Sequence, residues 1–261
     1  MNMNNKRLVY TVILDDYDSL TEIKEKNENI DYICITDNKN ITSNTWEVIY
    51  IEKEDNDSII INRMYKMLPH RFFPHYQTLY IDGNIAIIKD INNLFDKYLT
   101  QNSFAAPKHS IRDCIYEESL ACLKAKKEKE YNIHLLLMEL HDKKYPFNNG
   151  LLENNILFRK NEKKINDIME DWFVIFKNIC QRDQLSLCYL LWENNIKYQF
   201  VKEGPRYERN YFKINFHNKE KKLNILKKIH LYSKLNNKNS KTAFIINKII
   251  EALLQNRKLK K

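Results

Sequence analysis

An acid and an amide two residues apart interrupt a long apolar run in this chain. Within Leu79–Ile88, of sequence LYIDGNIAII, Asp82 and Asn84 flank Gly83, so a buried strand is predicted to stop at the carboxylate. Carboxylate and amide oxygens suit a hard divalent cation such as Mg²⁺ or Mn²⁺, and such a cation in turn suits a diphosphate. The same spacing also fits an ordinary Asp-Gly hairpin turn.

Two cations precede this segment. Arg63 and Lys66 lie three residues apart in a predicted helix, which makes them neighbours on one helix face. Beside a metal at Asp82 they could neutralise a diphosphate leaving group, the main electrostatic problem when a sugar leaves a nucleoside diphosphate. The alternative is a solvated helix face without a chemical role.

Two acidic positions follow in the second half of the chain. Glu153 ends a polar loop, NNGLLE, where a carboxylate could hydrogen-bond sugar hydroxyls or act as a general base, or be a plain loop acid. Asp183 and Gln184 open a predicted helix. Asp183 is a reasonable N-cap there, and the functional alternative is an acid-amide pair presented to a reacting sugar from the helix N-terminus.

Strand-like and helix-like segments alternate in the first half, in the rhythm that predicts an α/β fold with a mostly parallel sheet and helices on both faces. The predicted strands are Leu8–Leu14, Tyr32–Thr36, Trp46–Ile51 and Thr78–Ile81, and the helices are Leu20–Lys26 and Ile59–Leu68. Ligands of such sheets bind beyond the carboxyl ends of the strands. Asp15, Asp37 and Asp82 all follow strand ends, so we expect them along one edge of the sheet.

The second half predicts more helices than strands. The helices are Ile91–Leu99, Tyr116–Lys127, Ile133–Leu140, Ile165–Ile179 and Gln184–Trp192, and the strands are Ser103–Ala106 and Ile156–Phe158. Five cysteines without a CxxC pair indicate buried reduced thiols. No segment approaches the ~20 apolar residues that span a bilayer, and the first apolar run is too short for a signal peptide. We therefore expect a cytoplasmic protein.

The positive charge is concentrated at the C-terminus. Lys219–Lys261 holds thirteen Lys or Arg against Glu220 and Glu251, a balance of +11 within a total of +9, which leaves residues 1–218 near −2. A broad basic face for nucleic acid is therefore not expected on the body. The chain is interpreted as a domain over residues 1–217 and a basic helical extension over 218–261. The amphipathic helices of this extension either pack on the domain or attach it to an anionic membrane surface at the cytosolic face.

Several nucleotide-binding and hydrolase motifs are absent from the sequence. It contains no G-x-G-x-x-G, no G-x-x-x-x-G-K-[ST], no G-x-S-x-G and no H-E-x-x-H. Dinucleotide-binding Rossmann domains, P-loop proteins and the common serine and zinc hydrolases lose their main support.

The remaining clusters together resemble the nucleotide-sugar-dependent glycosyltransferases of GT-A fold, and most of all the plant and bacterial glycosyltransferase-like family that includes the alkaline-ceramidase-named and seed-mucilage proteins. The resemblance covers Val9 to His217. It rests on the order and spacing of VYTVILDDYD, YICITDN, NRMYKMLPHRFFPHYQTLYIDGNI, HSIRDCIYEE, NGLLENNILFR and RDQLSLCYLLW. It implies a Rossmann-like, mixed and mostly parallel central sheet flanked by helices, followed here by the basic helical tail.

The resemblance also implies roles for individual residues. The nucleoside would be met by Thr11, Asp15, Tyr17 and Asp37, and the diphosphate by Arg63 and Lys66. The metal, Mn²⁺ or Mg²⁺, would be held by Asp82, Asn84 and His217, and the donor sugar and acceptor would be surrounded by Glu153, Asp183 and Gln184. Asn84 departs from the family's Asp-x-Asp pattern, because it replaces the second aspartate.

The sequence therefore predicts a glycosyltransferase that moves a sugar from a nucleoside diphosphate donor, with a UDP-sugar expected, to a glycan, lipid or protein acceptor. The alternative is an inactive transferase-like binding protein that docks on membrane or nucleic acid through its tail. A hydrolase acting on lipid amides is suggested only by a name within the family, and no nucleophilic or zinc constellation supports it. The donor sugar, the acceptor, the stereochemical course and the oligomeric state stay open.

Overall fold

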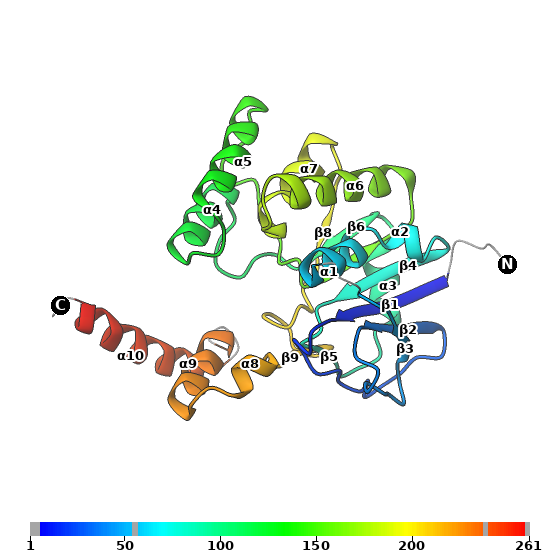
Figure 1. The fold of residues 1–261 in the computed structure, drawn as a ribbon, viewed down its shortest axis with the longest axis horizontal. Coiled ribbons are helices and arrows are strands. Elements are labelled where there is room, and N and C mark those ends of the chain that lie inside the picture. The colour runs from blue at the N-terminus through cyan, green and yellow to red at the C-terminus, as the bar shows by residue number, and fades with distance from the viewer. Residues whose placement is uncertain (1–5, 54–56, 237–239, 259–261) are drawn as a thin grey trace.

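A computed structural model describes residues 6–53, 57–236 and 240–258 of the chain. Within these residues seven strands form one mixed sheet in the order β3-β2-β1-β4-β7-β6-β8 (Figure 1). The strands are β1 (Lys6–Ile13), β2 (Ile30–Thr36), β3 (Glu47–Tyr50), β4 (Tyr76–Ile81), β6 (Phe104–Ala106), β7 (Ile156–Arg159) and β8 (Gln199–Phe200). Only β7 runs against its neighbours β4 and β6, while the other pairings are parallel. The predicted α/β class with a mixed, mostly parallel sheet is confirmed.

The central strand β1 is apolar on both faces because both faces are covered. Leu8, Tyr10 and Val12 belong to one hydrophobic core, and Val9 and Ile13 belong to a second core on the opposite side of the sheet. Such continuous apolar runs are typical of parallel strands between two layers. Each of these side chains contributes about 1.5–3 kcal/mol through its burial.

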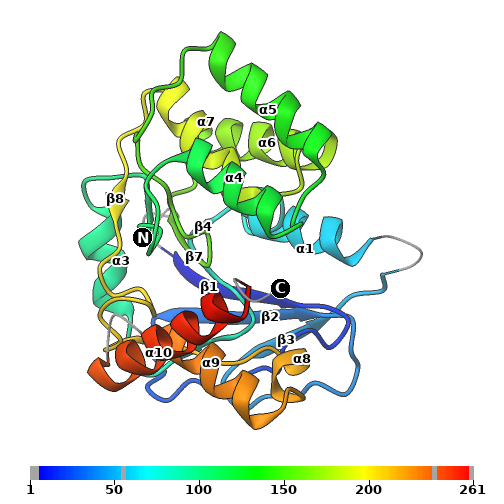
Figure 2. The same cartoon turned by 90° about the vertical axis from the view of Figure 1, so that its left-hand side faces the viewer.

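Helices cover one face, and a helix with a small second sheet covers the other (Figures 1 and 2). The helices of the body are α1 (Ser58–Met67), α2 (Pro69–Phe72), α3 (Asn92–Leu99), α4 (Ile115–Lys124), α5 (Glu130–Asp142), α6 (Lys163–Asn178) and α7 (Leu187–Glu193), with a 3-10 turn, η2 (Asp183–Leu185), before α7. Ile61 of α1 and Trp172 of α6 lie in the first core. Phe95 of α3 and Phe212 of the second sheet lie in the second core.

One predicted helix does not form, and one is interrupted. Residues 20–26 are irregular, because Glu22 accepts hydrogen bonds from the backbone N–H groups of Asn44 and Thr45 and so ties this segment to a neighbouring loop. Such side chain–backbone bonds compete with helix formation. The helix predicted over Gln184–Trp192 is divided at Ser186 into η2 and α7. The other predicted elements are present with shifted ends, and all five cysteines are free and buried.

Asp82–Asn84 connects two different sheets and is not the turn of a hairpin. The strand after it, β5 (Ile85–Ile87), pairs with β9 (Phe212–Ile214) in a separate antiparallel sheet instead of with β4. The Asp-Gly hairpin interpretation is therefore wrong. The connection is closed by a turn in which the Ile85 N–H donates to the Asp82 carbonyl at 2.9 Å.

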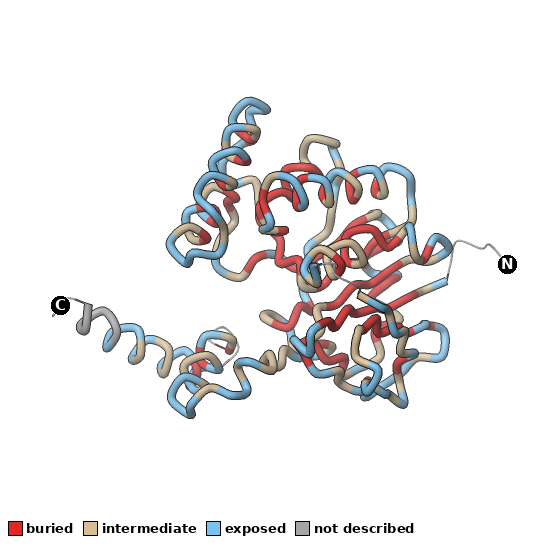
Figure 3. The backbone as a smooth tube through the Cα atoms, viewed as in Figure 1, coloured by how far each residue is buried: buried red, intermediate tan, exposed pale blue. Residues whose placement is uncertain are grey.

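The C-terminal segment extends away from the sheet as α8 (Asn218–Lys221), α9 (Ile225–Asn236) and α10 (Lys241–Lys258) (Figures 1 and 3). Here α9 and α10 pack against each other. Eight large apolar side chains on them are 41–74 % exposed, namely Ile225, Leu226, Ile229, Tyr232, Phe244, Ile245, Ile249 and Leu253. The expectation that these helices bury their apolar faces against the domain is wrong for these residues. Among the described helices, none combines the length and hydropathy needed to cross a membrane.

Gly83 allows the chain to turn tightly against β1. A Cβ atom built there would lie 2.9 Å from Ile13 Cγ1 and 3.0 Å from Asp18 Oδ2. We predict that Gly83→Ala lowers the free energy of unfolding by about 1–3 kcal/mol, the usual cost of overpacking a buried contact. Urea unfolding with an unchanged m-value measures this loss. Gln101→Ala, at an exposed position, is the control and should stay within about 0.5 kcal/mol of the native chain. Equal stability of the two variants would contradict the close contact.

Candidate active site

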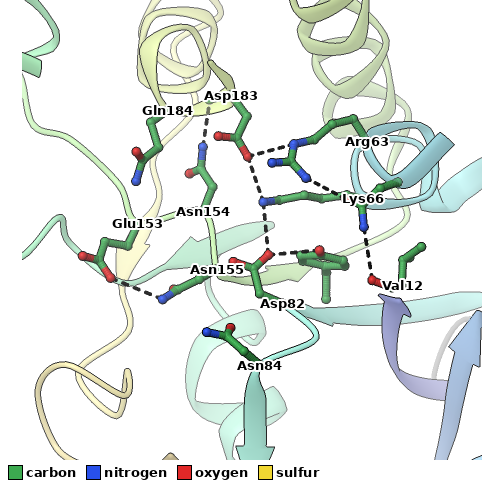
Figure 4. A network of polar contacts seen from close by, with 12 residues as sticks. Val12, Arg63, Lys66, Asp82, Asn84, Glu153, Asn154, Asn155, Asp183 and Gln184 are labelled. Atoms are coloured by element: carbon green, nitrogen blue, oxygen red, sulfur yellow. Dashed lines mark hydrogen bonds and ion pairs between the residues drawn. The ribbon is translucent and has the colours of Figure 1, made fainter. Parts of the chain in front are cut away.

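The ammonium group of Lys66 lies between two carboxylates at the carboxyl edge of the sheet, where β1, β2 and β4 end. Its Nζ is 2.8 Å from Asp183 Oδ2 and 3.4 Å from Asp82 Oδ1, and its side chain is only 2 % exposed (Figure 4). Lys66 is placed here because α1 ends just beyond it, since Leu68 precedes a proline and leaves the helical conformation. The interpretation of this residue as part of a solvated helix face is wrong.

The carboxylate of Asp183 pairs with two cations, and its backbone carbonyl accepts two hydrogen bonds. Burial disfavours its charged form, but the Lys66 ammonium and the Arg63 guanidinium outweigh this and keep the pKa of Asp183 well below its usual range. Its carbonyl accepts from Asn154 Nδ2 and Trp172 Nε1, both at 3.0 Å. Asp183 caps neither η2 nor α7, whose N-caps are the residues at 182 and 186, so its interpretation as an N-cap is wrong.

Arg63 completes a group of two cations and two anions. Its Nε is 3.4 Å from Asp183 Oδ2, and its guanidinium lies over the Phe176 ring at 5.7 Å. Although burial opposes it, the Asp183 carboxylate helps to raise the pKa of Arg63. Arg63, Lys66, Asp82 and Asp183 therefore carry no net charge together, and the structure brings together four of the residues selected from the sequence.

Asp82 and Asn84 lie on either side of the turn, as Figure 4 shows, below Asp183 and Lys66 in that view. Asp82 Oδ1 accepts from the Tyr80 hydroxyl at 3.0 Å, and the Asp82 side chain remains 34 % exposed. Asn84 Nδ2 donates to the carbonyl of Asn215 at 3.1 Å. This bond fixes which end of the amide is nitrogen.

His217, which follows β9 in the C-terminal part of the chain, lies next to Asn84. Its Nδ1 lies 2.7 Å from Asp18 Oδ1, and its Nε2 lies 3.4 Å from Asn84 Nδ2. The hydrogen bond to Asp18 raises the pKa of His217. Metal-ligating histidines are usually oriented by such a bond from Nδ1–H to a carboxylate, although here Nε2 faces the amide nitrogen of Asn84. Asp18 was not selected from the sequence, because nothing local distinguishes it from Asp15 and Asp16.

The chemistry of this donor set fits a divalent cation in type. Asp82 and Asn84 offer oxygen, and His217 offers an oriented nitrogen. No group of three or more His, Cys, Asp or Glu that could hold a metal is found in the part of the chain that the structure describes. Any site here would therefore depend on the amide of Asn84.

Asp15 and Asp37 meet beyond the ends of β1 and β2. The Asp15 backbone N–H donates to Asp37 Oδ1 at 3.1 Å, and Lys53 forms ion pairs with both carboxylates. The hydrogen bond from Lys53 lowers the pKa of Asp15. Asp15 and Asp16 have φ angles of 54° and 49°, a left-handed conformation that costs energy for residues with a side chain. Lys53 was not selected from the sequence.

Tyr17 and Thr11 differ in how they relate to this edge. Tyr17 is half exposed, and its ring lies 4.8 Å from the His217 ring, so the end of β1 and the C-terminal histidine share one surface. Thr11 is buried within β1, opposite Cys34 of β2. The structure brings Tyr17 to the edge but leaves Thr11 inside the sheet.

Glu153 and Gln184 lie to one side of Asp82 (Figure 4). Glu153 is buried, and its Oε2 accepts from Arg206 Nε at 2.8 Å and from Asn155 Nδ2 at 3.3 Å. It is therefore more than a plain loop acid. Gln184 Oε1 accepts from the guanidinium of Arg182 at 3.3 Å. Arg206 was missed, and only its place just after Gly204-Pro205 marks it in the sequence.

Comparison with known proteins identifies one family. A family model described as the TOD1/MUCI70 glycosyltransferase-like domain matches residues 1–229. Similar solved structures include the glycosyltransferase GlyE of Streptococcus pneumoniae TIGR4 (14 % identity, 77 % of this chain and 46 % of that one, TM-score 0.42). They also include the apo form of the bifunctional glycosyltransferase WbbM (13 % identity, 84 % of this chain and 42 % of that one, TM-score 0.44). The chain spans less than half the length of either. No curated protein matches it.

The buried pair of Lys66 and Asp183 should show strong energetic coupling. Lys66→Met leaves a buried carboxylate with less compensation, so we predict a loss of about 3–5 kcal/mol in the free energy of unfolding. In the double variant Lys66→Met/Asp183→Asn the loss should fall short of the sum of the two single losses by about 1–3 kcal/mol. Urea unfolding of the four proteins gives this value.

A matched pair on the surface is the control for this cycle. Lys163 and Asp167 are 2.7 Å apart in α6, with side chains 87 % and 61 % exposed. The corresponding cycle should give no more than about 0.5 kcal/mol. If both cycles gave the same small coupling, the central role of Lys66 would be refuted.

Proposed function

Because this chain belongs to the TOD1/MUCI70 glycosyltransferase-like family, we propose that it is a transferase that takes a sugar from a nucleoside diphosphate donor, with uridine diphosphate as the expected carrier, and passes it to a glycan, lipid or protein acceptor. The observation that carries this proposal is the position of Asp82 beside Lys66 at the carboxyl edge of the sheet, with Arg63 linked to the same group through Asp183. Ligands of α/β sheets bind beyond this edge.

The charge at this edge supports a role for a divalent cation. Two carboxylates already neutralise Arg63 and Lys66, so these four groups together offer no surplus positive charge to a departing diphosphate. Asp82, Asn84 and His217 would hold Mn²⁺ or Mg²⁺, with Asp18 orienting the imidazole. When bound, the cation would neutralise the diphosphate and stabilise its departure.

The protein's own side chains would divide the remaining work. Asp15, Asp37 and Tyr17 line the edge where the nucleoside would lie, with the two carboxylates as acceptors for hydroxyl or N–H groups. Asp183 is a poor base, because its neighbouring cations lower its pKa, and its role here is to hold Lys66 and Arg63 in place. Glu153, beside Gln184, is the carboxylate that would orient the acceptor hydroxyl.

The central experiment compares Asp82→Ala with the native chain. Release of UDP from a panel of UDP-sugars in the presence of Mn²⁺ should fall by about 10²–10³-fold, the usual effect of removing a group that stabilises developing charge. In the same variant, UDP with Mn²⁺ should no longer raise the melting temperature. Asp142→Asn, whose side chain is 79 % exposed, is the control and should behave as the native chain does.

Two outcomes would count against the proposal. Full turnover by Asp82→Ala would remove the metal site. Absence of any melting shift in the native chain, with every nucleotide and with either metal, would favour the alternative of an inactive binding protein. A ligand at 100-fold above its dissociation constant adds about 2.7 kcal/mol, so the shift is readily measured.

We also propose that α9 and α10 attach the protein to an anionic lipid surface. Their apolar side chains are exposed, and the segment Lys219–Lys261 carries a charge of +11, which complements acidic headgroups. Each lysine close to such a surface contributes about 1 kcal/mol, and the exposed isoleucine, leucine and phenylalanine side chains add their transfer energy.

Vesicle sedimentation tests this attachment. The native chain should bind vesicles that contain phosphatidylglycerol and not vesicles of phosphatidylcholine alone. Lys227→Glu/Lys228→Glu should weaken binding at least about 30-fold, because each reversal removes an attraction and adds a repulsion. Lys163→Glu/Lys164→Glu, an exposed pair on α6, is the control with the same charge change. Equal effects of the two double variants would contradict the lipid attachment. A stable dimer that does not bind vesicles would also contradict it, because a second copy of the chain would then cover these helices.

A further inference from the structure

A hollow opens at the same edge of the sheet as Asp82. This cavity, of about 420 Å³, is lined by Lys108, just after β6, by Phe200 at the end of β8, and by residues of the segment that follows, with Lys202, Arg206, Tyr207 and Glu208 among them. Strand β6 is antiparallel to β7, which is itself antiparallel to β4, so β6 and its parallel neighbour β8 end at the carboxyl edge too. The cavity therefore lies on the side where a ligand of this fold is bound.

Another cavity does not qualify as part of the same site. It has about 490 Å³ and is lined by Arg7, Gln77 and Asn92 among others. Arg7 and Gln77 stand at the beginnings of β1 and β4, so this hollow lies at the opposite edge of the sheet from Asp82.

A short series of contacts links Asp82 to the cavity at the carboxyl edge. The Asp82 N–H donates to the Asn155 carbonyl at 2.9 Å, and Asn155 Nδ2 donates to Glu153 Oε2 at 3.3 Å. The same oxygen of Glu153 accepts from Nε of Arg206, which lines the cavity, at 2.8 Å. Glu153 thus stands between the two places, directly behind Arg206 of the cavity wall.

The lining predicts the chemistry of the occupant. Lys108, Lys202 and Arg206 are cationic, and only Glu208 among the lining residues is acidic. Because the Glu153 carboxylate outside the lining pairs with Arg206, a balance of one positive charge remains on the lining. Lys108 also forms a long ion pair with Asp113, outside the lining, at 3.9 Å, while Lys202 forms no ion pair with any residue that the structure describes. Arg206 and lysine side chains are the usual partners of phosphate and carboxylate groups.

Aromatic surface accompanies these cations. Phe200 is 39 % exposed, and the ammonium of Lys108 lies 6.0 Å from the centre of its ring. The Tyr207 hydroxyl donates to the carbonyls of Lys108 and His109, which fixes its ring against this wall. A flat apolar face beside cationic groups suits a ring that is apolar on one side and carries an anionic substituent.

We propose that this cavity is the acceptor subsite, and that the acceptor is a saccharide carrying a phosphate or carboxylate group. The proposal rests on the transferase function proposed above and specifies its second substrate. The anionic group contacts Lys108 and Lys202, the sugar ring lies against Phe200, and the receiving hydroxyl points to Glu153.

Binding of simple sugars to the full chain tests this subsite without any donor. The probes are glucose 6-phosphate, glucuronic acid, neutral glucose and inorganic phosphate, followed by calorimetry or ligand-observed NMR. Both anionic sugars should bind at least about tenfold more tightly than glucose, and also more tightly than phosphate, with an affinity that falls as salt rises. A preference for one of the two sugars identifies the anionic group.

Substitution then locates the binding. Lys108→Ala and Lys202→Ala should each weaken binding of the anionic sugars about tenfold, equivalent to one charge-assisted hydrogen bond, and Phe200→Ala should weaken the sugars without affecting phosphate. Lys197→Ala, an exposed lysine outside the lining, should change nothing. Circular dichroism of each variant shows that it is folded.

The outcomes separate this proposal from the one on which it rests. Equal binding of glucose and its charged derivatives, or native affinity in Lys108→Ala/Lys202→Ala, would overturn the subsite. If inorganic phosphate bound as tightly as glucose 6-phosphate, the cavity would be a general anion site, and the proposal of a saccharide acceptor would be wrong. The melting shift with UDP and Mn²⁺ reports on the donor site independently. Failure of the acceptor test therefore does not affect the conclusion about the donor site, and the reverse also holds.

Discussion

The buried ammonium of Lys66 is the contact on which the geometry of this edge depends. It joins the end of α1, the turn after β4 and the start of η2, three elements that are far apart in the sequence. A charge so deeply buried is tolerated only when it is paired and hydrogen-bonded. Since each of its two carboxylates comes from a different element, a shift of any one of them leaves charge without compensation.

The backbone of Lys66 is fixed as firmly as its side chain. Arg159 donates to the Lys66 carbonyl and to the Tyr10 hydroxyl, both at 2.6 Å, and all three residues are deeply buried. Arg159 thus donates to a carbonyl at the end of α1 that the helix itself cannot satisfy. The position of the Lys66 ammonium therefore depends on polar contacts inside the core.

Sequence patterns predicted the positions that depend on local order. Asp15, Asp37 and Asp82 were placed on one edge because apolar strands end at them, and the parallel pairing of β1 with β2 and β4 confirms this. The partners across the fold could not be predicted in the same way. Lys66 and Asp183 are 117 residues apart, and no periodicity relates them.

The errors arise from tertiary contacts that override local patterns. Residues 20–26 contain the apolar spacing of a helix, but Glu22 finds its hydrogen-bond partners in another loop, and this tertiary contact decides the conformation. Asp82–Asn84 has the composition of a hairpin turn, yet β5 pairs with β9 because that pairing covers the second core. That same pairing delivers His217, since the Asn215 N–H donates to the Asn84 carbonyl at 2.8 Å.

The contact between Asp18 and His217 spans 199 residues, nearly the whole length of the body. Contacts of such long range must close a large loop before they give any stabilisation, and they tend to form late. On a ribosome, the imidazole emerges only after every strand of both sheets has been synthesised. Chains that end before His217 therefore lack the contact that joins Asp18 to the end of the second sheet.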